Sequence, residues 1–85
     1  MTTPSIVHNS AAQRFETTVE GHLSMIEYRL DGDAIIFTHT EVPEALRGQG
    51  LASKLVEVAV TFARTENKRI MSECSYVTAW LSRHP

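Results

Sequence analysis

The chain has 85 residues, which is enough for one small domain with a single core. Its net charge of −2 and calculated isoelectric point near 6.0 argue against the strong basic field that nucleic-acid binding needs. Its single cysteine excludes an internal disulfide and a cysteine-based zinc site, so we expect no metal. The chain begins without a signal-peptide pattern and has no apolar run of the ~20 residues that span a bilayer. We therefore expect a cytoplasmic protein that binds neither nucleic acid nor membrane.

The first half of the chain alternates between apolar and polar residues, as half-buried strands do. Residues 1–11 are polar, and we expect them to be irregular. Three strands are predicted after them, over residues 14–19, 22–30 and 33–42. Asp31 and Gly32 are a strong two-residue hairpin signal between the second and third of these strands. The three segments therefore predict an antiparallel meander.

The hydrophobic period changes after Pro43, which cannot donate to a ladder and so ends the third strand. Apolar residues then recur at helical spacing, which predicts a long amphipathic helix from about residue 49 to 66. Residues 68–74 are short enough for a fourth strand, and residues 75–84 indicate a final helix. The order βββαβα predicts an α/β (α+β layered) fold in a single domain over residues 1–85. We expect a mostly antiparallel sheet with one long helix packed on it and a short C-terminal helix.

The segment RGQGLA, from Arg47 to Ala52, joins the third strand to the long helix. Backbone N–H groups at a helix start lack internal partners and carry partial positive charge, and glycine allows an anion to approach closely. Gly48 and Gly50 thus make the turn a candidate phosphate cradle, to which Arg47 can add a bidentate contact. The Walker A spacing is absent, and the Rossmann spacing fails because residue 53 is serine. An ordinary strand-to-helix turn is the alternative.

The same six residues match the Q/R-x-x-G-x-G/A signature of the GCN5-related N-acetyltransferases. The wider string HTEVPEALRGQGLASKLVE (39–57), with RFE upstream and CSYVTAWLSRHP (74–85) downstream, resembles the small single-domain members of that family. The resemblance implies a minimal form of the family fold and an acetyl-coenzyme A-dependent N-acetyltransferase acting on an amine of a small molecule or a protein. A module that binds coenzyme A or acyl-coenzyme A without transferring the acetyl group is the alternative.

In that family, acetyl-coenzyme A lies in a cleft that corresponds here to the gap between the predicted third and fourth strands. The resemblance implies that the loop amides hold the pyrophosphate and that the backbone near Glu41 and Val42 holds the pantetheine arm. The implied cofactor-binding residues are Glu41, Val42, Arg47, Gly48, Gln49, Gly50, Leu51, Ala52, Ser53 and Cys74. The two helices that usually cover the acceptor have no room before Arg14. We therefore expect an acceptor site that is open, or that a partner protein or second copy completes.

His39 and Glu41 are candidates for catalysis on the third strand. They are two residues apart, so regular alternation places both on the same face as Ile35 and Phe37. Acetyl transfer needs a deprotonated amine, and imidazole is suited to act as a general base near neutral pH. The alternative is that the strand end simply emerges into solvent.

Cys74 is the third catalytic candidate, because it stands between the fourth strand and the final helix, whose dipole lowers a thiol pKa. Beside the pantetheine channel it would take the acetyl group, protonate the leaving thiolate or only line the channel. Burial as a small apolar residue is the alternative. Arg83 stands about where full-length family members commonly have a proton-donating tyrosine. Tyr76 and Trp80, four residues apart, are expected to pack on the sheet.

Overall fold

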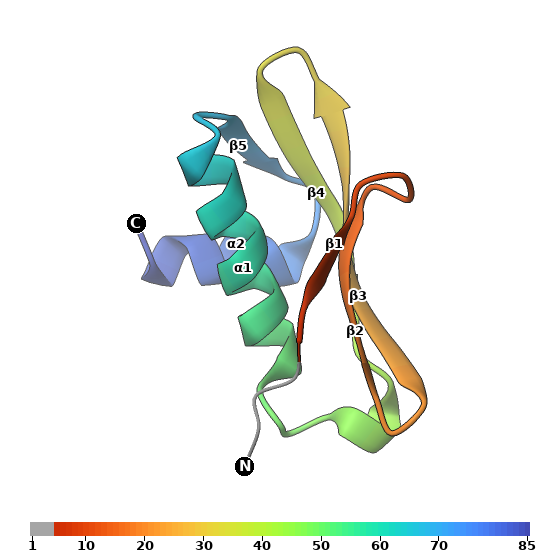
Figure 1. The fold of residues 1–85 in the computed structure, drawn as a ribbon. Coiled ribbons are helices and arrows are strands. Elements are labelled where there is room, and N and C mark those ends of the chain that lie inside the picture. Colours follow the sequence, from red (N-terminus) through yellow and green to blue (C-terminus); the bar gives the residue numbers. More distant parts are fainter. Residues whose placement is uncertain (1–4) are drawn as a thin grey trace.

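The computed structural model describes residues 5–85 and contains one five-stranded sheet and two α-helices (Figure 1). The elements are β1 (Val7–Asn9), β2 (Arg14–Val19), β3 (His22–Asp31), β4 (Ala34–Glu41), the 3₁₀ turn η1 (Glu44–Leu46), α1 (Leu51–Thr65), β5 (Arg69–Ser72) and α2 (Ser75–Arg83). The strands lie in chain order across the sheet, and only β4 and β5 are parallel. The predicted α+β fold is confirmed, with β1 added before the expected βββαβα order.

The N-terminal segment is more regular than its composition predicts, because β1 pairs antiparallel with β2. His8 stacks on Phe15 with ring centroids 4.1 Å apart, and its Nε2 lies 2.6 Å from the Tyr28 hydroxyl. Asn9 donates a side-chain hydrogen bond of 2.6 Å to Glu16. The prediction that residues 1–11 are irregular was wrong at β1, since these polar side chains find partners on the sheet. Residues 1–4 of that prediction lie outside the described residues.

Tight hairpins connect β2 to β3 and β3 to β4. Glu20 and Gly21 have positive φ angles of 52° and 78°, the arrangement that favours a two-residue hairpin loop. In the second hairpin, Asp31 pairs with Ala34, so the loop residues are Gly32 and Asp33. The predicted hairpin is confirmed, but its loop lies one residue later than expected.

The helix α1 forms because its apolar residues recur on one stripe that faces the sheet. The buried residues of this stripe are Leu51, Leu55, Val56, Ala59, Val60 and Ala63. All of them except Leu51 share one core with Ile26, Ile35 and Phe37 of the sheet and with Val77 and Trp80 of α2. Each large side chain in this core contributes about 1.5–3 kcal/mol through burial. Figure 1 shows that both helices lie on the same side of β2, β3 and β4.

A β-bulge at Thr38 interrupts the regular alternation of β4. Tyr28 pairs with Phe37 but Glu27 pairs with His39, so Thr38 is an extra residue on β4. A bulge of this kind shifts the residues that follow it to the opposite faces of the sheet.

The bulge reverses the faces of the last residues of β4. Phe37 is fully buried in the core, whereas His39 and Glu41 have side chains that are 54% and 60% exposed. Thr40 points to the core side, where its hydroxyl contacts Cys74. The prediction that His39 and Glu41 share a face with Phe37 was therefore wrong, because it assumed unbroken alternation.

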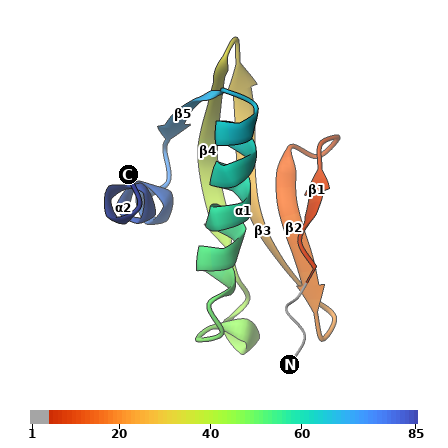
Figure 2. The ribbon, with the colours of Figure 1, turned by 60° about the vertical axis from the view of Figure 1, so that its left-hand side comes forward.

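The strands β4 and β5 are joined only over part of their length. Their register runs from the Ala34–Arg69 pair to the Phe37–Ser72 pair, and the Glu73 amide then donates to the Phe37 carbonyl at 2.8 Å. Beyond this bond the chain turns into α2, while β4 continues to Glu41 (Figure 2). The two strands therefore separate at the bulge. Neither helix in the described part of the chain is long and apolar enough to cross a membrane.

Candidate functional site at the start of α1 and the separation of β4 and β5

The loop before α1 takes its shape from a buried anchor and two glycines. Leu46 is fully buried, and its amide bonds to the Pro43 carbonyl at 2.9 Å. Gly48 and Gly50 have φ angles of +86° and +74°, in the left-handed region that glycine adopts without strain. A Cβ added at either position would meet no protein atom within 4 Å, so the backbone conformation requires glycine here and protein packing does not. The space beside both glycines is open to a ligand.

The first turn of α1 presents backbone donors without a protein cap. Gly50 is the N-cap residue, and among the described residues no side chain caps the helix. The first turn contains no acidic residue, and the Lys54 amide makes the first helical hydrogen bond, to the Gly50 carbonyl at 3.1 Å. The N–H groups that precede it carry the positive end of the helix dipole. This arrangement is suited to a phosphate group.

A hollow of about 220 Å³ lies against this loop. Its lining residues are Val42, Leu46, Arg47, Gly48, Gly50, Leu51, Ala52, Ser53 and Tyr76. Most of the residues predicted to bind the cofactor thus line the hollow. The predicted residues that do not line it are Glu41, Gln49 and Cys74. The volume is below the roughly 300–1,000 Å³ of pockets that enclose a whole ligand. A ligand of coenzyme size would extend beyond the hollow along the surface.

The start of α2 covers one side of the hollow. Tyr76 lines it and remains 37% exposed, so the prediction that this residue packs on the sheet was wrong. Trp80, one turn later, is only 4% exposed and packs in the core, as predicted. Helical spacing places both residues on one stripe, but the sequence does not show that the first turn of α2 lies beside the loop before α1.

Trp80 also links α2 to the loop. Its indole Nε1 donates a hydrogen bond of 3.2 Å to the Ser53 hydroxyl, in the first turn of α1. His84 stacks on the indole with centroids 3.9 Å apart, and its carbonyl accepts a bond from Arg64 of α1 at 2.9 Å. These contacts connect α2 to both ends of α1. The His84 ring itself contacts the indole and the carbonyl of Trp80.

Cys74 is the N-cap residue of α2 and lies at the separation of the strands. Its Sγ is 3.7 Å from the Thr40 hydroxyl of β4. Burial raises the pKa of the thiol, but the nearby backbone groups of Val77, Tyr76 and Thr40 and the Thr40 side chain outweigh it and leave the pKa below its usual 9.0. The direction of the shift agrees with the expectation for this thiol, and Thr40 is a contributing residue that sequence alternation missed.

His39 and Glu41 form a separate pair on the opposite face of the sheet. Their Nε2 and Oε1 atoms are 3.6 Å apart, and both side chains are largely exposed. The bulge thus places the two predicted catalytic side chains on one side of β4 and Cys74 on the other. His39 is therefore reached from the outer face of the sheet and not from the side of the core.

Comparison with known proteins shows the family to which this fold and loop belong. The sequence profile described as GCN5-related N-acetyl-transferase matches residues 14–85. This range includes both helices and all strands from β2 to β5. The chain belongs to the GCN5-related N-acetyltransferase family. The family resemblance inferred from RGQGLA is therefore confirmed.

Individual relatives share this domain over almost its whole length. Protein NATD1 of Bos taurus is 29% identical over 83 residues, which cover 94% of this chain and 74% of the relative. Protein NATD1 of Homo sapiens is 28% identical over the same coverage. The NMR structure of a GCN5-like candidate N-acetyltransferase from Staphylococcus aureus is 30% identical and superposes with a TM-score of 0.76. That likeness covers 99% of this chain and 83% of the other.

Proposed function

We propose that the protein is an acetyl-coenzyme A-dependent N-acetyltransferase that acetylates an amine of a small molecule or of a protein. The observation that carries the proposal is the position of the uncapped start of α1 beside the point where β4 and β5 separate. In this proposal the start of α1 binds the phosphates, and the open edge of β4 lies beside it along the same surface. The proposed location is the cytoplasm, a reducing compartment that suits a free thiol.

The residues around the hollow fit the anionic end of the coenzyme. The amides of Gly48, Gln49, Gly50, Leu51, Ala52 and Ser53 would hold its pyrophosphate, with Arg47 beside them. The glycines leave space for the ligand, since a Cβ on either would point into open space. Val42 and the unpaired edge of β4 near Glu41 would hold the pantetheine arm through backbone groups, and Tyr76 would contact its side. When bound, acetyl-coenzyme A supplies the activated acetyl thioester.

The chain's own side chains supply the proton transfers that the reaction needs. In acetyl transfer to an amine, a C–N bond forms, the C–S bond breaks, the amine loses a proton and the departing thiolate gains one. We assign the first proton to His39, whose imidazole is exposed on the outer face and adjoins the Glu41 carboxylate. We assign the second to the cleft side, where the Cys74 thiol and the Tyr76 hydroxyl are the candidate donors.

Cys74 has a second proposed role, as an acceptor of the acetyl group itself. A thiol with a lowered pKa has a larger thiolate fraction at neutral pH, and the thiolate is the nucleophile. In that case the coenzyme thiol leaves first, and the amine then attacks an acetyl-cysteine. If Cys74 only lines the channel, its replacement by alanine leaves acetyl transfer largely intact.

The alternative function is a coenzyme-binding module without transfer activity. The observation that favours it is the exposure of His39 and Glu41, whose side chains are 54% and 60% exposed on the outer face of the sheet. An acceptor would then have no enclosed site unless a partner protein or a second copy of the chain completed one. In this alternative the loop still binds the coenzyme, but His39 does not act as a general base.

Two measurements test these proposals. Thermal unfolding with acetyl-coenzyme A, coenzyme A and ATP tests the cradle, and we expect both coenzyme forms to raise the melting temperature more than ATP does. The absence of stabilisation by either coenzyme form would remove both functions. Release of free coenzyme thiol during incubation with a panel of amines then separates them. Release that depends on an amine supports the transferase, whereas binding without release supports the module.

A further inference from the structure

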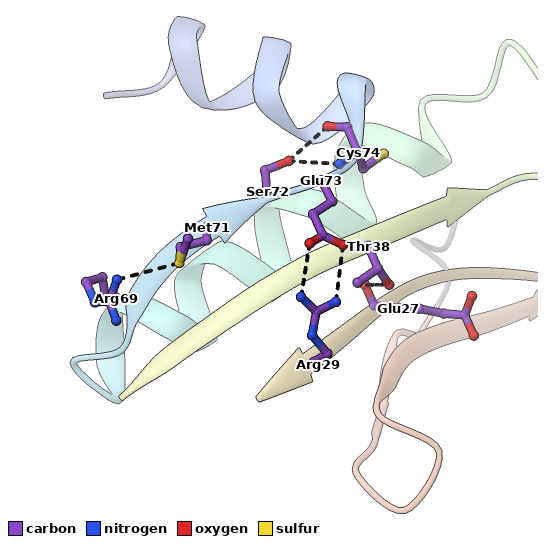
Figure 3. Close-up of polar contacts among 8 residues, drawn as sticks. All are labelled: Glu27, Arg29, Thr38, Arg69, Met71, Ser72, Glu73 and Cys74. Atoms are coloured by element: carbon purple, nitrogen blue, oxygen red, sulfur yellow. Dashed lines mark hydrogen bonds and ion pairs between the residues drawn. The ribbon is translucent and has the colours of Figure 1, made fainter. Parts of the chain in front are cut away.

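Arg29 and Glu73 form a two-bond ion pair across the outer face of β4. Arg29 of β3 donates from Nη1 and Nη2 to the two carboxylate oxygens of Glu73, at 3.1 and 3.0 Å. Figure 3 shows the pair lying over β4, which runs between the strands that carry the two residues. Glu73 follows directly on β5 and precedes Cys74. The pair therefore connects β3 to the end of β5 at the place where β5 leaves the sheet.

The pair lies next to the bulge of β4. Arg29 is opposite Ile36 in the register, and the Glu73 amide makes the last bond to β4, at Phe37. Thr38, the extra residue, bonds through its hydroxyl to the Glu27 carbonyl of β3 at 3.4 Å (Figure 3). Residue 73 is thus held by its backbone on β4 and by its side chain on β3. Two attachments at one residue therefore constrain the chain just before it enters α2.

Cys74 depends on that direction for its hydrogen bonds. Its carbonyl accepts bonds from the Ser72 and Thr78 hydroxyls at 2.9 and 3.1 Å, its thiol donates to the Thr40 hydroxyl at 3.7 Å, and the nearby backbone of Tyr76 and Val77 lowers the thiol pKa. The groups that perturb the thiol pKa are burial and these hydrogen bonds; no charged group of the described residues is among them. We therefore expect any influence of Arg29 and Glu73 on the thiol to act through geometry.

We propose that Arg29 and Glu73 are positioning residues of the cleft, and that their ion pair holds the end of β5 so that the Cys74 thiol faces Thr40 and the first amides of α2. This inference rests on the proposed function, because it concerns the same cleft. Neither residue touches the hollow at the start of α1. The pair should therefore affect Cys74 and leave coenzyme binding by the loop unchanged.

The test is the pH profile of Cys74 alkylation by iodoacetamide in the intact protein. For both Arg29→Gln and Glu73→Gln, we expect the midpoint of the profile to move upward, with roughly threefold less thiolate at neutral pH. The charge-reversed double variant Arg29→Glu/Glu73→Arg is expected to return the profile to within about twofold of the parent. The matched control is Arg69→Gln, which breaks the 3.3 Å Arg69–Asp33 pair at the other end of the β4–β5 pairing.

The outcomes separate positioning from simple charge. Shifts of opposite sign in the two glutamine variants would show that only the charges act on the thiol, and unchanged profiles would show that the pair does not act on it at all; either result overturns the proposal. Failure of the charge-reversed variant to restore the profile also overturns it. The alkylation profile needs no coenzyme. If acetyl-coenzyme A does not bind the parent protein, the proposed function fails while the profile still reports on the pair.

Discussion

The Thr40 hydroxyl and the Cys74 thiol lie 3.7 Å apart and connect the free end of β4 to the start of α2. This contact exists because the bulge at Thr38 turns Thr40 to the core side. Without the bulge, His39 would face Cys74 and Thr40 would face solvent. The bulge thus places the polar residues at the end of β4 on opposite faces of the sheet. Thr40 adjoins the candidate nucleophile Cys74, and His39 lies on the exposed outer face of the sheet.

The thiol of Cys74 is expected to titrate below the usual pKa of 9.0. Because the pKa is lowered in the folded protein, the thiol contributes stability that is present above the unfolded pKa and lost as pH falls through the folded pKa. The difference in unfolding free energy between the native protein and Cys74→Ser should therefore increase as pH rises from the folded pKa towards 9.0. Denaturant unfolding at several pH values measures it. Thr40→Val should reduce the increase, and a pH-independent difference would contradict the assignment.

Gly50→Ala should weaken acetyl-coenzyme A binding by about tenfold or more, since its Cβ would enter the space of the ligand. The positive φ of +74° also adds a strain of about 1–2 kcal/mol. Gly32→Ala is the matched control, because Gly32 has a φ of +58° and open space around it but lies in the β3–β4 hairpin. Calorimetric titration measures binding and thermal unfolding measures strain. Equal binding by the two variants would contradict the role of the loop.

His39→Gln should lower the rate of acetyl transfer by about a hundredfold or more, the usual contribution of a general base, with little change in coenzyme affinity. Exposed His22 on β3 provides the control variant His22→Gln. The rate of thiol release at saturating coenzyme measures the effect. Equal rates for the two variants would remove His39 from the mechanism.

Exposure to acetyl-coenzyme A without an amine should add one acetyl group to the native protein if Cys74 is a covalent acceptor. Intact-protein mass spectrometry detects the adduct, and Cys74→Ala should lack it. An adduct that persists in Cys74→Ala would place the acetyl group on another residue. A native protein without an adduct would leave Cys74 as a proton donor or a channel wall.

The contact between Trp80 and Ser53 should matter for stability. Ser53→Ala leaves the partly buried indole N–H without its partner and should cost about 1 kcal/mol. Trp80→Ala also removes a buried ring from the core and should cost about 3–5 kcal/mol. Chemical denaturation measures both values. Ser82→Ala, which removes an exposed hydroxyl bond within α2, is the control and should cost less than Ser53→Ala.

The main features of the fold were predictable from the sequence because they depend on local periodicity. The alternation in β2 and β3, the proline after β4 and the helical stripe of α1 each identify an element to within a few residues. The loop was predictable for a similar reason. Gly48 and Gly50 stand where a strand ends and a helix begins, and both have the positive φ angles that favour glycine.

The parts of the site that were missed depend on contacts between distant segments. The bulge at Thr38 arises in the pairing of β3 with β4 and leaves no periodic signal in β4 alone. The strand β1 is stabilised by His8 against Phe15 and Tyr28, which lie on two other strands. The place of Tyr76 beside the loop likewise depends on how α2 packs on α1. Strict alternation was therefore sufficient for locating strands and insufficient for assigning faces near the cleft.

Backbone amide NMR during titration with acetyl-coenzyme A tests the central claim most directly, because it reports on each region of the chain separately. We predict the largest shift changes at Arg47 to Ser53, smaller changes at Thr40, Cys74 and Tyr76, and little change in β1 and β2. Saturable changes confined to that cleft would support the account. No changes, or changes centred on β1 and β2, would contradict it.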